Sequence, residues 1–237
     1  MKKIVIFILL FLIVSSVAVS SYNHKVIALK TIQYSTFKQI RKNVFVTPET
    51  TEKQKADLLN LLKKAEERIK NTFGSYTASP IIIASHNEVS RQKFSRKSYA
   101  SAILLPFSQS EAYVTIGENG HNLDIISHEL LHAEVFHRLG YFNQIFKVPV
   151  WFNEGVAMQV DFREKYKSLS ANNSDIKKLW YGWQFFKGDG ETLIYNYSSA
   201  KKEVELWLKN SKKEKLYSFL NKIKNGESFE TLYHSGN

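Results

Sequence analysis

The sequence predicts an α+β fold, with a small mixed sheet and helices in its N-terminal half and a helical C-terminal half. Short apolar runs bounded by turn residues, which are typical of strands, occur in the first half of the chain. Apolar residues at a helical period lie between these runs, and the segments after Pro149 have helical character. With 237 residues, 43% of them apolar, the chain can bury one sizeable core.

The first predicted strand covers residues 43–48, where a proline ends it. Thr50 or Thr51 can cap the next helix, because a threonine hydroxyl accepts a hydrogen bond from the first helical turn. Apolar residues at a helical spacing predict that this helix covers residues 55–73. Gly74 is the expected helix end.

Three more strands are predicted before the midpoint of the chain. Residues 80–85 form a continuous apolar run, which favours a buried strand, and residues 99–107 favour another. Residues 112–117 alternate apolar and polar side chains, so we expect a strand with one face in solvent. In the second half, the predicted helices cover residues 151–162, 174–186, 200–210 and 213–224.

The first twenty residues differ from the rest. Lys2 and Lys3 precede an apolar run over residues 4–19, and Ala18-Val19-Ser20 is a small-x-small pattern of the kind that a signal peptidase accepts. Residues 1–20 are therefore a signal peptide or an uncleaved N-terminal anchor, and residues 21–237 are the folded domain. Both alternatives predict an exported protein of the cell envelope, periplasmic or extracellular, with membrane association through residues 4–19 if the anchor stays.

Composition excludes several classes of site. The chain has no cysteine, so it has no disulfides, no lipid anchor on cysteine and no thiolate metal site. Its formal charge of +11 allows contact with anionic lipid or cell-wall polymer, or only a well-solvated surface. No nucleic-acid motif accompanies the charge, so we expect no nucleic-acid partner. The sequence leaves the oligomeric state open.

The helix predicted from Leu123 to Leu139, with Asn122 as its cap and Gly140 as its end, contains the pattern H-E-L-L-H. His128 and His132 are four residues apart, so both imidazoles project from one face and can reach one metal ion. Glu129 is turned about 100° from His128 and can reach a metal-bound water as a general base. The competing interpretation is an ordinary amphipathic helix with histidines on its polar face.

A second pattern, W-F-N-E-G-V-A, begins at Trp151. Glu154 follows His132 by 22 residues, which is enough chain for a loop and a second helix to return a carboxylate to the two imidazoles. Three protein ligands leave one position open for water, as a catalytic zinc requires. Gly155 and Ala157 are small, so we expect the second helix to approach the first closely.

These two patterns together resemble the gluzincin zinc metallopeptidases, and most closely the peptidase-MA-like domains. The matching positions are His128, Glu129, His132, Trp151, Asn153, Glu154, Gly155 and Ala157. The tail, with Y-N-Y-S-S-A at residues 195–200 and a G-x-S-F-E turn, is similar to the helical end of that group. The resemblance covers roughly residues 117–233. It implies a zincin-like fold and a domain that hydrolyses a peptide or protein substrate with one Zn²⁺ ion.

The resemblance also implies the roles of the site residues. His128, His132 and Glu154 would hold zinc, which lowers the pKa of its water, and Glu129 would accept and return the proton. A tyrosine would stabilise the oxyanion; Tyr197 fits the motif best and Tyr195 next, while packing is the alternative for both. Position 158 is methionine where thermolysin-like enzymes carry a second acid, and Asp161 is a candidate substitute or a surface acid.

The chain departs from the aminopeptidases, since it lacks their G-x-M-E-N stretch, and their exopeptidase specificity does not carry over. By fold analogy, residues 112–117 are the edge strand that binds extended substrate. The alternative function is a catalytically silent zincin-fold module that binds metal or peptide in the cell envelope. A structural envelope protein with a fortuitous motif is a third alternative.

Five further residues receive weaker predictions. His137 is expected to face away from the metal, and His121 and His86 to lie in loops. Glu134 is expected to pair with Arg138 at the surface, or to lie in the outer shell of the metal. Asp124 either interacts with the helix dipole in the first turn or orients His128.

Overall fold

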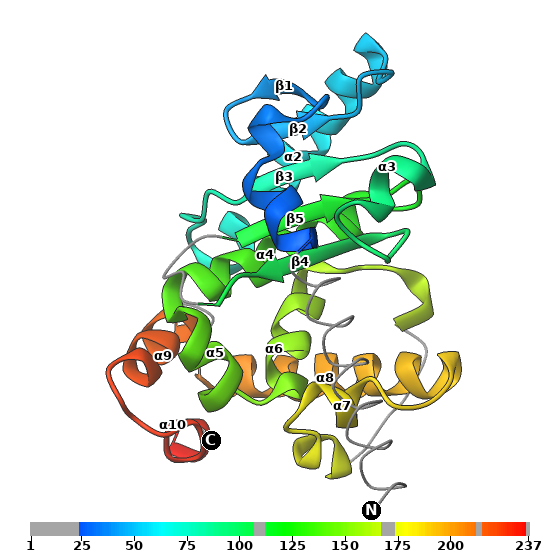
Figure 1. Cartoon of the computed structure of the whole chain (residues 1–237). Helices are drawn as coiled ribbons and strands as arrows, with labels where there is room; N and C mark the ends of the chain where they lie inside the picture. The colour runs from blue at the N-terminus through cyan, green and yellow to red at the C-terminus, as the bar shows by residue number, and fades with distance from the viewer. Residues whose placement is uncertain (1–23, 107–111, 167–173, 212–214, 236–237) are drawn as a thin grey trace, which may run out of the picture.

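The computed structural model describes residues 24–106, 112–166, 174–211 and 215–235. The fold is α+β, with a sheet in the upper part of the molecule and a helical layer below it (Figure 1). The expected leader, residues 1–20, lies outside the described residues. No helix in the described ranges has the length and apolar character needed to cross a bilayer.

The sheet has five strands in the spatial order β1-β2-β3-β5-β4. Its strands are β1 (Lys38–Arg41), β2 (Val44–Val46), β3 (Ile81–Ala84), β4 (Ala100–Leu104) and β5 (Ala112–Ile116). The three central strands are parallel, and both edge strands run antiparallel to their neighbours, so the predicted mixed sheet is confirmed. Strand β1 was not predicted; it pairs with β2 through a tight turn at Asn43, whose φ is 63°.

Helix α2 (Glu52–Phe73) forms where the sequence predicted it. Thr51 caps it, accepting a hydrogen bond from the backbone N–H of Gln54 while the Gln54 side chain accepts one from Thr51 N–H. Gly74 ends the helix with a φ of 90°, which favours glycine. The apolar face of α2 packs against helix α4 (Leu123–Leu139), next to the sheet.

The prediction for residues 112–117 was right about the strand and wrong about its place. Strand β5 is an inner strand between β3 and β4, and every residue in it is buried. Val114 faces the main core with α4, whereas Tyr113 packs in a second cluster with Leu29 and Ile32 from the N-terminal segment. Both faces of β5 are therefore covered, and the strand at this edge of the sheet is β4.

Helix α4 is the central rod of the molecule. Asn122 caps it by accepting from the backbone N–H groups of Asp124 and Ile125, and Gly140 ends it, both as predicted. It contacts β4 and β5, α2, and three helices of the lower layer, α5, α6 and α9. Its burial on nearly all sides means that a polar side chain on α4 requires a specific partner.

The lower layer contains six α-helices among the described residues. They are α5 (Tyr141–Lys147), α6 (Val150–Ala157), α7 (Gly182–Phe185), α8 (Gly190–Ser211), α9 (Lys215–Lys224) and α10 (Phe229–Ser235). Helix α6 packs on α4 and more extensively on α8, while α9 packs on the far end of α4 (Figure 1). The predicted helix at 213–224 is confirmed as α9, although residues 212–214 lie outside the described ranges.

The single helix predicted over residues 174–186 is wrong. A 3-10 helix (Ser174–Lys178) is followed by non-helical residues and then by the short α7. The carbonyls of Leu179 and Trp180 accept hydrogen bonds from Trp151 N–H and Val150 N–H at the start of α6. These carbonyls satisfy donors that the first turn of α6 leaves free, so they are not available to an uninterrupted helix here.

Two other helix boundaries also differ from the prediction. The helix predicted over 151–162 ends at Ala157 and passes through a 3-10 turn (Met158–Val160), because Val160 O and Phe162 N make tertiary hydrogen bonds to Arg68 and Asp124. The helix predicted over 200–210 begins ten residues earlier, at Gly190. Asp189, which accepts from Thr192 N–H at 2.9 Å, is the cap that the sequence analysis overlooked.

Glu134 and Arg138 do form an i,i+4 pair, but Glu134 is fully buried and does not belong to the surface. Its carboxylate accepts hydrogen bonds from Thr77 N–H and Ala78 N–H, at 2.8 and 2.6 Å. The Arg138 guanidinium lies over the ring of Tyr217 in α9. Glu134 therefore fixes the segment between α2 and β3 to α4 and has no place around a metal.

Candidate metal centre

His128 and His132 project from one face of α4, as their spacing predicted. Their Nε2 atoms are 3.1 Å apart, and the side chains are 7% and 11% exposed. The rings meet edge to face, with centroids 4.8 Å apart. Two buried imidazoles that direct nitrogens to the same point require a proton or a cation between them.

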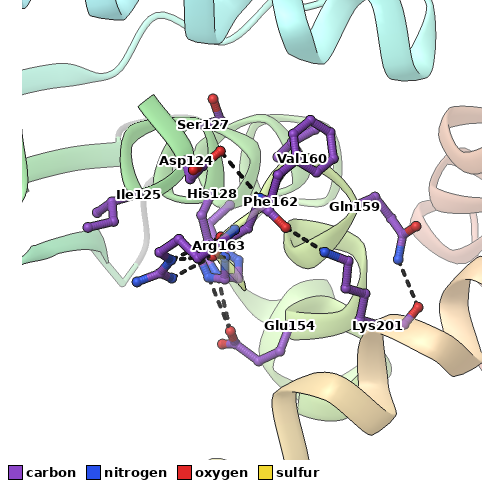
Figure 2. Close-up of polar contacts among 12 residues, drawn as sticks. Asp124, Ile125, Ser127, His128, Glu154, Gln159, Val160, Phe162, Arg163 and Lys201 are labelled. Carbon is purple, nitrogen blue, oxygen red and sulfur yellow. Dashed lines mark hydrogen bonds and ion pairs between the residues drawn. The ribbon is translucent and has the colours of Figure 1, made fainter. Parts of the chain in front are cut away.

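Glu154 reaches the same point from α6. Its Oε2 atom lies 3.4 Å from His128 Nε2 and 3.4 Å from His132 Nε2, and Figure 2 shows the side chain extending from α6 toward the imidazoles. Gly155 permits this position, because a Cβ there would lie 2.5 Å from the carbonyl oxygen of Ala200. Gly155 thus faces α8, although α6 also packs on α4.

The three side chains form a buried group that can hold a metal ion. A tetrahedral ion with ligand distances of about 2.0–2.1 Å has ligand atoms about 3.3–3.4 Å apart. The observed separations of 3.1, 3.4 and 3.4 Å match that geometry closely. Glu154 Oε2 is also buried without a hydrogen-bond partner, so a cation is the missing partner that the site implies.

The charges around the group favour a bound cation. Burial disfavours ionisation of Glu154, but the two histidines outweigh it and hold the pKa of the carboxyl well below its usual range. Burial likewise opposes protonation of His128, yet the nearby carboxylates of Asp161 and Glu154 raise the pKa of the imidazole to about 10. A proton on His128 thus occupies the position that a metal ion would take.

Asp161 stands behind His128. It is fully buried, and its Oδ2 atom is 3.5 Å from His128 Nδ1, a nitrogen with no shorter polar contact. A carboxylate on the second nitrogen of a metal-binding histidine fixes the tautomer and the ring orientation. Of the two interpretations that the sequence allowed for Asp161, the surface acid is wrong.

A set of basic side chains holds Asp161 in place. Arg163 donates to both of its carboxylate oxygens, at 2.9 and 3.1 Å from Nε, and Lys201 Nζ donates to its backbone carbonyl at 2.5 Å (Figure 2). Burial disfavours the Asp161 anion, but the bonds to His128 and Arg163 outweigh this effect and lower its pKa.

Asp124 lies in the first turn of α4, as expected for an interaction with the helix dipole, and its carboxylate also has specific partners. It pairs with Arg68 at 2.5 Å and accepts from the backbone N–H of Phe162, while Arg68 also donates to Val160 O. It therefore does not orient His128 directly. It anchors the residues on both sides of Asp161 to α2 and α4.

Glu129 lies beside the group, with Oε2 accepting the backbone N–H of Ala102 at 2.6 Å. Ala102 belongs to β4, the edge strand next to α4. The carboxylate has no other hydrogen bond among the described residues, so one oxygen remains for a water molecule or a substrate.

Tyr197 is at the site and Tyr195 is not. The Tyr197 ring lies 6.2 Å from the His128 ring, whereas Tyr195 is 36% exposed on another side of α8. Burial, together with Glu154 and Glu129, raises the pKa of Tyr197, so the phenol stays protonated at neutral pH and can donate. Tyr166, which the sequence analysis missed, packs against Tyr197 with ring centroids 5.6 Å apart.

The other histidines lie outside the group. His137 is half-buried near the end of α4, on the side where its spacing placed it, and does not join the ligand atoms. His86 and His121 lie in loops, as predicted, and their rings stack with centroids 4.1 Å apart.

Sequence reasoning also missed Arg163 and Arg68, which fix the segment around Asp161. No local pattern in the sequence marks either residue. The partners of Arg68 are distant in the chain, and the partner of Arg163 lies in an irregular turn. Comparison of the chain with protein-family models, with curated proteins and with solved structures finds no match.

Proposed function

We propose that the chain is an exported zinc-dependent metallopeptidase of the gluzincin type, with a zincin-like domain that hydrolyses peptide bonds. The observation that carries this proposal is the buried triangle of His128, His132 and Glu154, with Glu129 next to it on the same helix. Two imidazoles and a carboxylate suit Zn²⁺. When bound, the ion supplies Lewis-acid polarisation of the substrate carbonyl and a water molecule of lowered pKa.

The protein's own side chains account for the remaining steps. Glu129 accepts a proton from the attacking water and returns it to the leaving amine, as a general base and then a general acid. Its hydrogen bond from Ala102 N–H fixes the carboxylate rotamer. Tyr197, protonated because its pKa is raised, donates to the oxygen on which negative charge develops.

The substrate backbone has a natural place at β4. Within the described residues, β4 pairs with β5 on one side and with no strand on the other. Ala102 N–H already points away from β5 toward Glu129, so alternate backbone groups of β4 face the same way. An extended peptide added to this edge would lie next to Glu129.

The test is Glu129→Gln. The amide keeps an oxygen for Ala102 N–H, so the fold and the metal ligands should be retained while the general base is lost. We expect about one zinc per chain by elemental analysis and a loss of peptide cleavage of at least about 100-fold. Cleavage is measured on a broad peptide library by mass spectrometry, with and without chelator.

The matched control is Glu67→Gln, an exposed residue of α2, which should cleave as the unaltered protein does. Cleavage that survives Glu129→Gln would remove this mechanism. Metal bound without any cleavage by the unaltered protein would favour the alternative, a silent metal- or peptide-binding module. One observation favours this silent module. The hydrogen bond from Ala102 N–H to Glu129 Oε2 competes with a water molecule for the same carboxylate oxygen.

Export is part of the same proposal, because it rests on the leader at residues 1–20. A fusion of the chain to a reporter enzyme that is active only outside the cytoplasm should be active. An inactive, stable fusion would contradict export while leaving the peptidase proposal standing.

A further inference from the structure

A second concave site lies away from the metal group. It is a cavity of about 340 Å³ between α2, the β1–β2 turn and the segment that leads into β3. None of the three proposed metal ligands lines it. Its volume is within the range of small-molecule sites, roughly 300–1,000 Å³.

The floor of this cavity is apolar and belongs to the main core. Val44, Leu62, Ile82 and Leu130 line it, and each is at most 3% exposed. They come from β2, α2, β3 and α4, so the floor is formed by rigid elements. These nearly buried residues offer a small apolar surface to a ligand that enters.

The rim is positively charged. Arg41, Lys42 and Lys70 line the cavity, and Glu66 is the acidic residue among its lining. Glu66 pairs with Arg41 at 3.3 Å, whereas Lys42 and Lys70 have no carboxylate partner in the described part of the chain. The rim thus has two uncompensated ammonium groups, which favour an anion.

Tyr76 adds a neutral donor to the same lining. Burial, with Glu66 next, raises the pKa of its phenol, so the hydroxyl is protonated at neutral pH. It has no hydrogen bond to the described residues. Such a hydroxyl can donate a hydrogen bond to a ligand in the cavity.

The walls are held in place without any ligand. Asn43 Nδ2 donates to Ser79 O at 3.3 Å and is 3.1 Å from Ser79 Oγ, which ties the β1–β2 turn to the segment before β3. Glu134 fixes the neighbouring Thr77 and Ala78 through their N–H groups. A site that is already ordered loses less entropy when it binds a ligand.

We propose that this cavity binds a small amphipathic carboxylate, with its apolar body on the floor and its carboxylate between Lys42 and Lys70, where Tyr76 donates to it. Short aliphatic and aromatic acids share this chemistry. Leu130 follows Glu129 directly on α4, so a ligand here contacts the helix that carries the metal ligands. The inference does not depend on the peptidase proposal, since the cavity shares none of the ligands.

The test is a titration of the purified chain with hexanoate and, separately, with 3-phenylpropionate, followed by ¹H–¹⁵N NMR. We expect saturable one-site binding, with the largest shifts at the amides of residues 41–43 and 76–79. Hexanamide, which lacks the charge, should bind at least about tenfold more weakly. Comparison of the affinities for hexanoate and 3-phenylpropionate shows whether the cavity prefers an aliphatic or an aromatic acid.

Lys70→Glu and Lys64→Glu make a matched pair of variants. Both residues are exposed on α2 and both changes alter the net charge equally, but only Lys70 lines the cavity. We expect Lys70→Glu to weaken hexanoate at least about tenfold and Lys64→Glu to change it less than about twofold. Tyr76→Phe should weaken it by severalfold. No saturable binding, equal effects of the two lysine variants, or equal binding of hexanamide would each overturn the proposal.

Discussion

Asp161 lies next to Nδ1 of His128, whereas Nε2 of the same ring is directed to His132 and Glu154. Its Oδ2 atom is 3.5 Å from His128 Nδ1, and Arg163 binds both carboxylate oxygens. On a regular helix, the residue one turn after Glu154 would be at position 158. That residue is a methionine and not an acid. The 3-10 turn after α6 changes the direction of the chain, so an acid three residues later takes that place.

Asp161→Asn should weaken zinc binding by about 10–100-fold, because the neutral amide is a poorer acceptor for His128 Nδ1–H and leaves Arg163 unpaired. Competition with a chelator of known affinity measures the change. The control is Asp57→Asn, an exposed residue of α2 that should leave the affinity unchanged. Equal affinities in both variants would show that Asp161 has no role in the metal site.

Zinc binding should tighten as the pH rises. In the metal-free protein the pKa of His128 is raised to about 10, so its proton must leave when the metal binds. The same raised pKa stabilises the metal-free fold below the unfolded pKa, near 6.5, and that contribution is lost as the pH rises through the folded value. Both effects favour the metal-bound form at higher pH.

Chelator competition at pH 6.5 and pH 8.5 measures this dependence. Calorimetry in buffers of different ionisation enthalpy should also detect release of about one proton per zinc bound. An affinity that is equal at both pH values, without proton release, would contradict the prediction.

Helix α6 is held on several sides. It has α8 on one side and α4 on another, and the backbone carbonyls of residues 179 and 180 meet its first turn. Gly155 lies close to α8, since a Cβ there would be 2.5 Å from Ala200 O. The position of Glu154 therefore depends on packing that lies on the side of α6 away from the metal group.

Gly155→Ala should destabilise the fold by about 1–3 kcal/mol and weaken metal binding, since the added Cβ would lie 2.5 Å from Ala200 O and displace α6. Urea unfolding and chelator competition measure the two effects. Gly190→Ala is the matched control, because a Cβ there meets nothing within 4 Å. It should be neutral or slightly stabilising, and an equal loss in both variants would exclude the packing explanation.

Across the whole molecule, the metal group joins the two halves of the fold. His128 and His132 belong to the rod beneath the sheet, and Glu154 belongs to the helical layer. An ion held by all three would link α4 to α6. After removal of the ion, α4 and α6 would be joined by the apolar contacts of the core.

Chelation should therefore lower the thermal midpoint. Zinc at 100 times its dissociation constant stabilises by about 2.7 kcal/mol, which is roughly 5–10 °C for a domain of this size. Scanning calorimetry with and without chelator measures the shift. His132→Ala should abolish the shift and His137→Ala, on the same helix, should keep it; a shift that persists in His132→Ala would exclude this metal group as its cause.

The sequence by itself determined what depends on local spacing. Two histidines four residues apart on a helix share a face, Thr51 and Asn122 cap the helices that they precede, and apolar runs gave the four strands that were predicted. In each case the energy comes from hydrogen bonds within a turn or from a regular apolar period, and both can be read from neighbouring residues.

Only the tertiary structure decided what depends on distant partners. Strand β5 alternates like a surface strand, yet the N-terminal segment covers its second face. Residues 174–186 have helical character, yet two of their carbonyls accept hydrogen bonds from N–H groups at the start of α6. Glu134 and Asp161 look like surface acids, yet each is buried with an arginine. A buried charge or backbone group requires a partner, and the fold alone supplies partners that are far apart in the sequence.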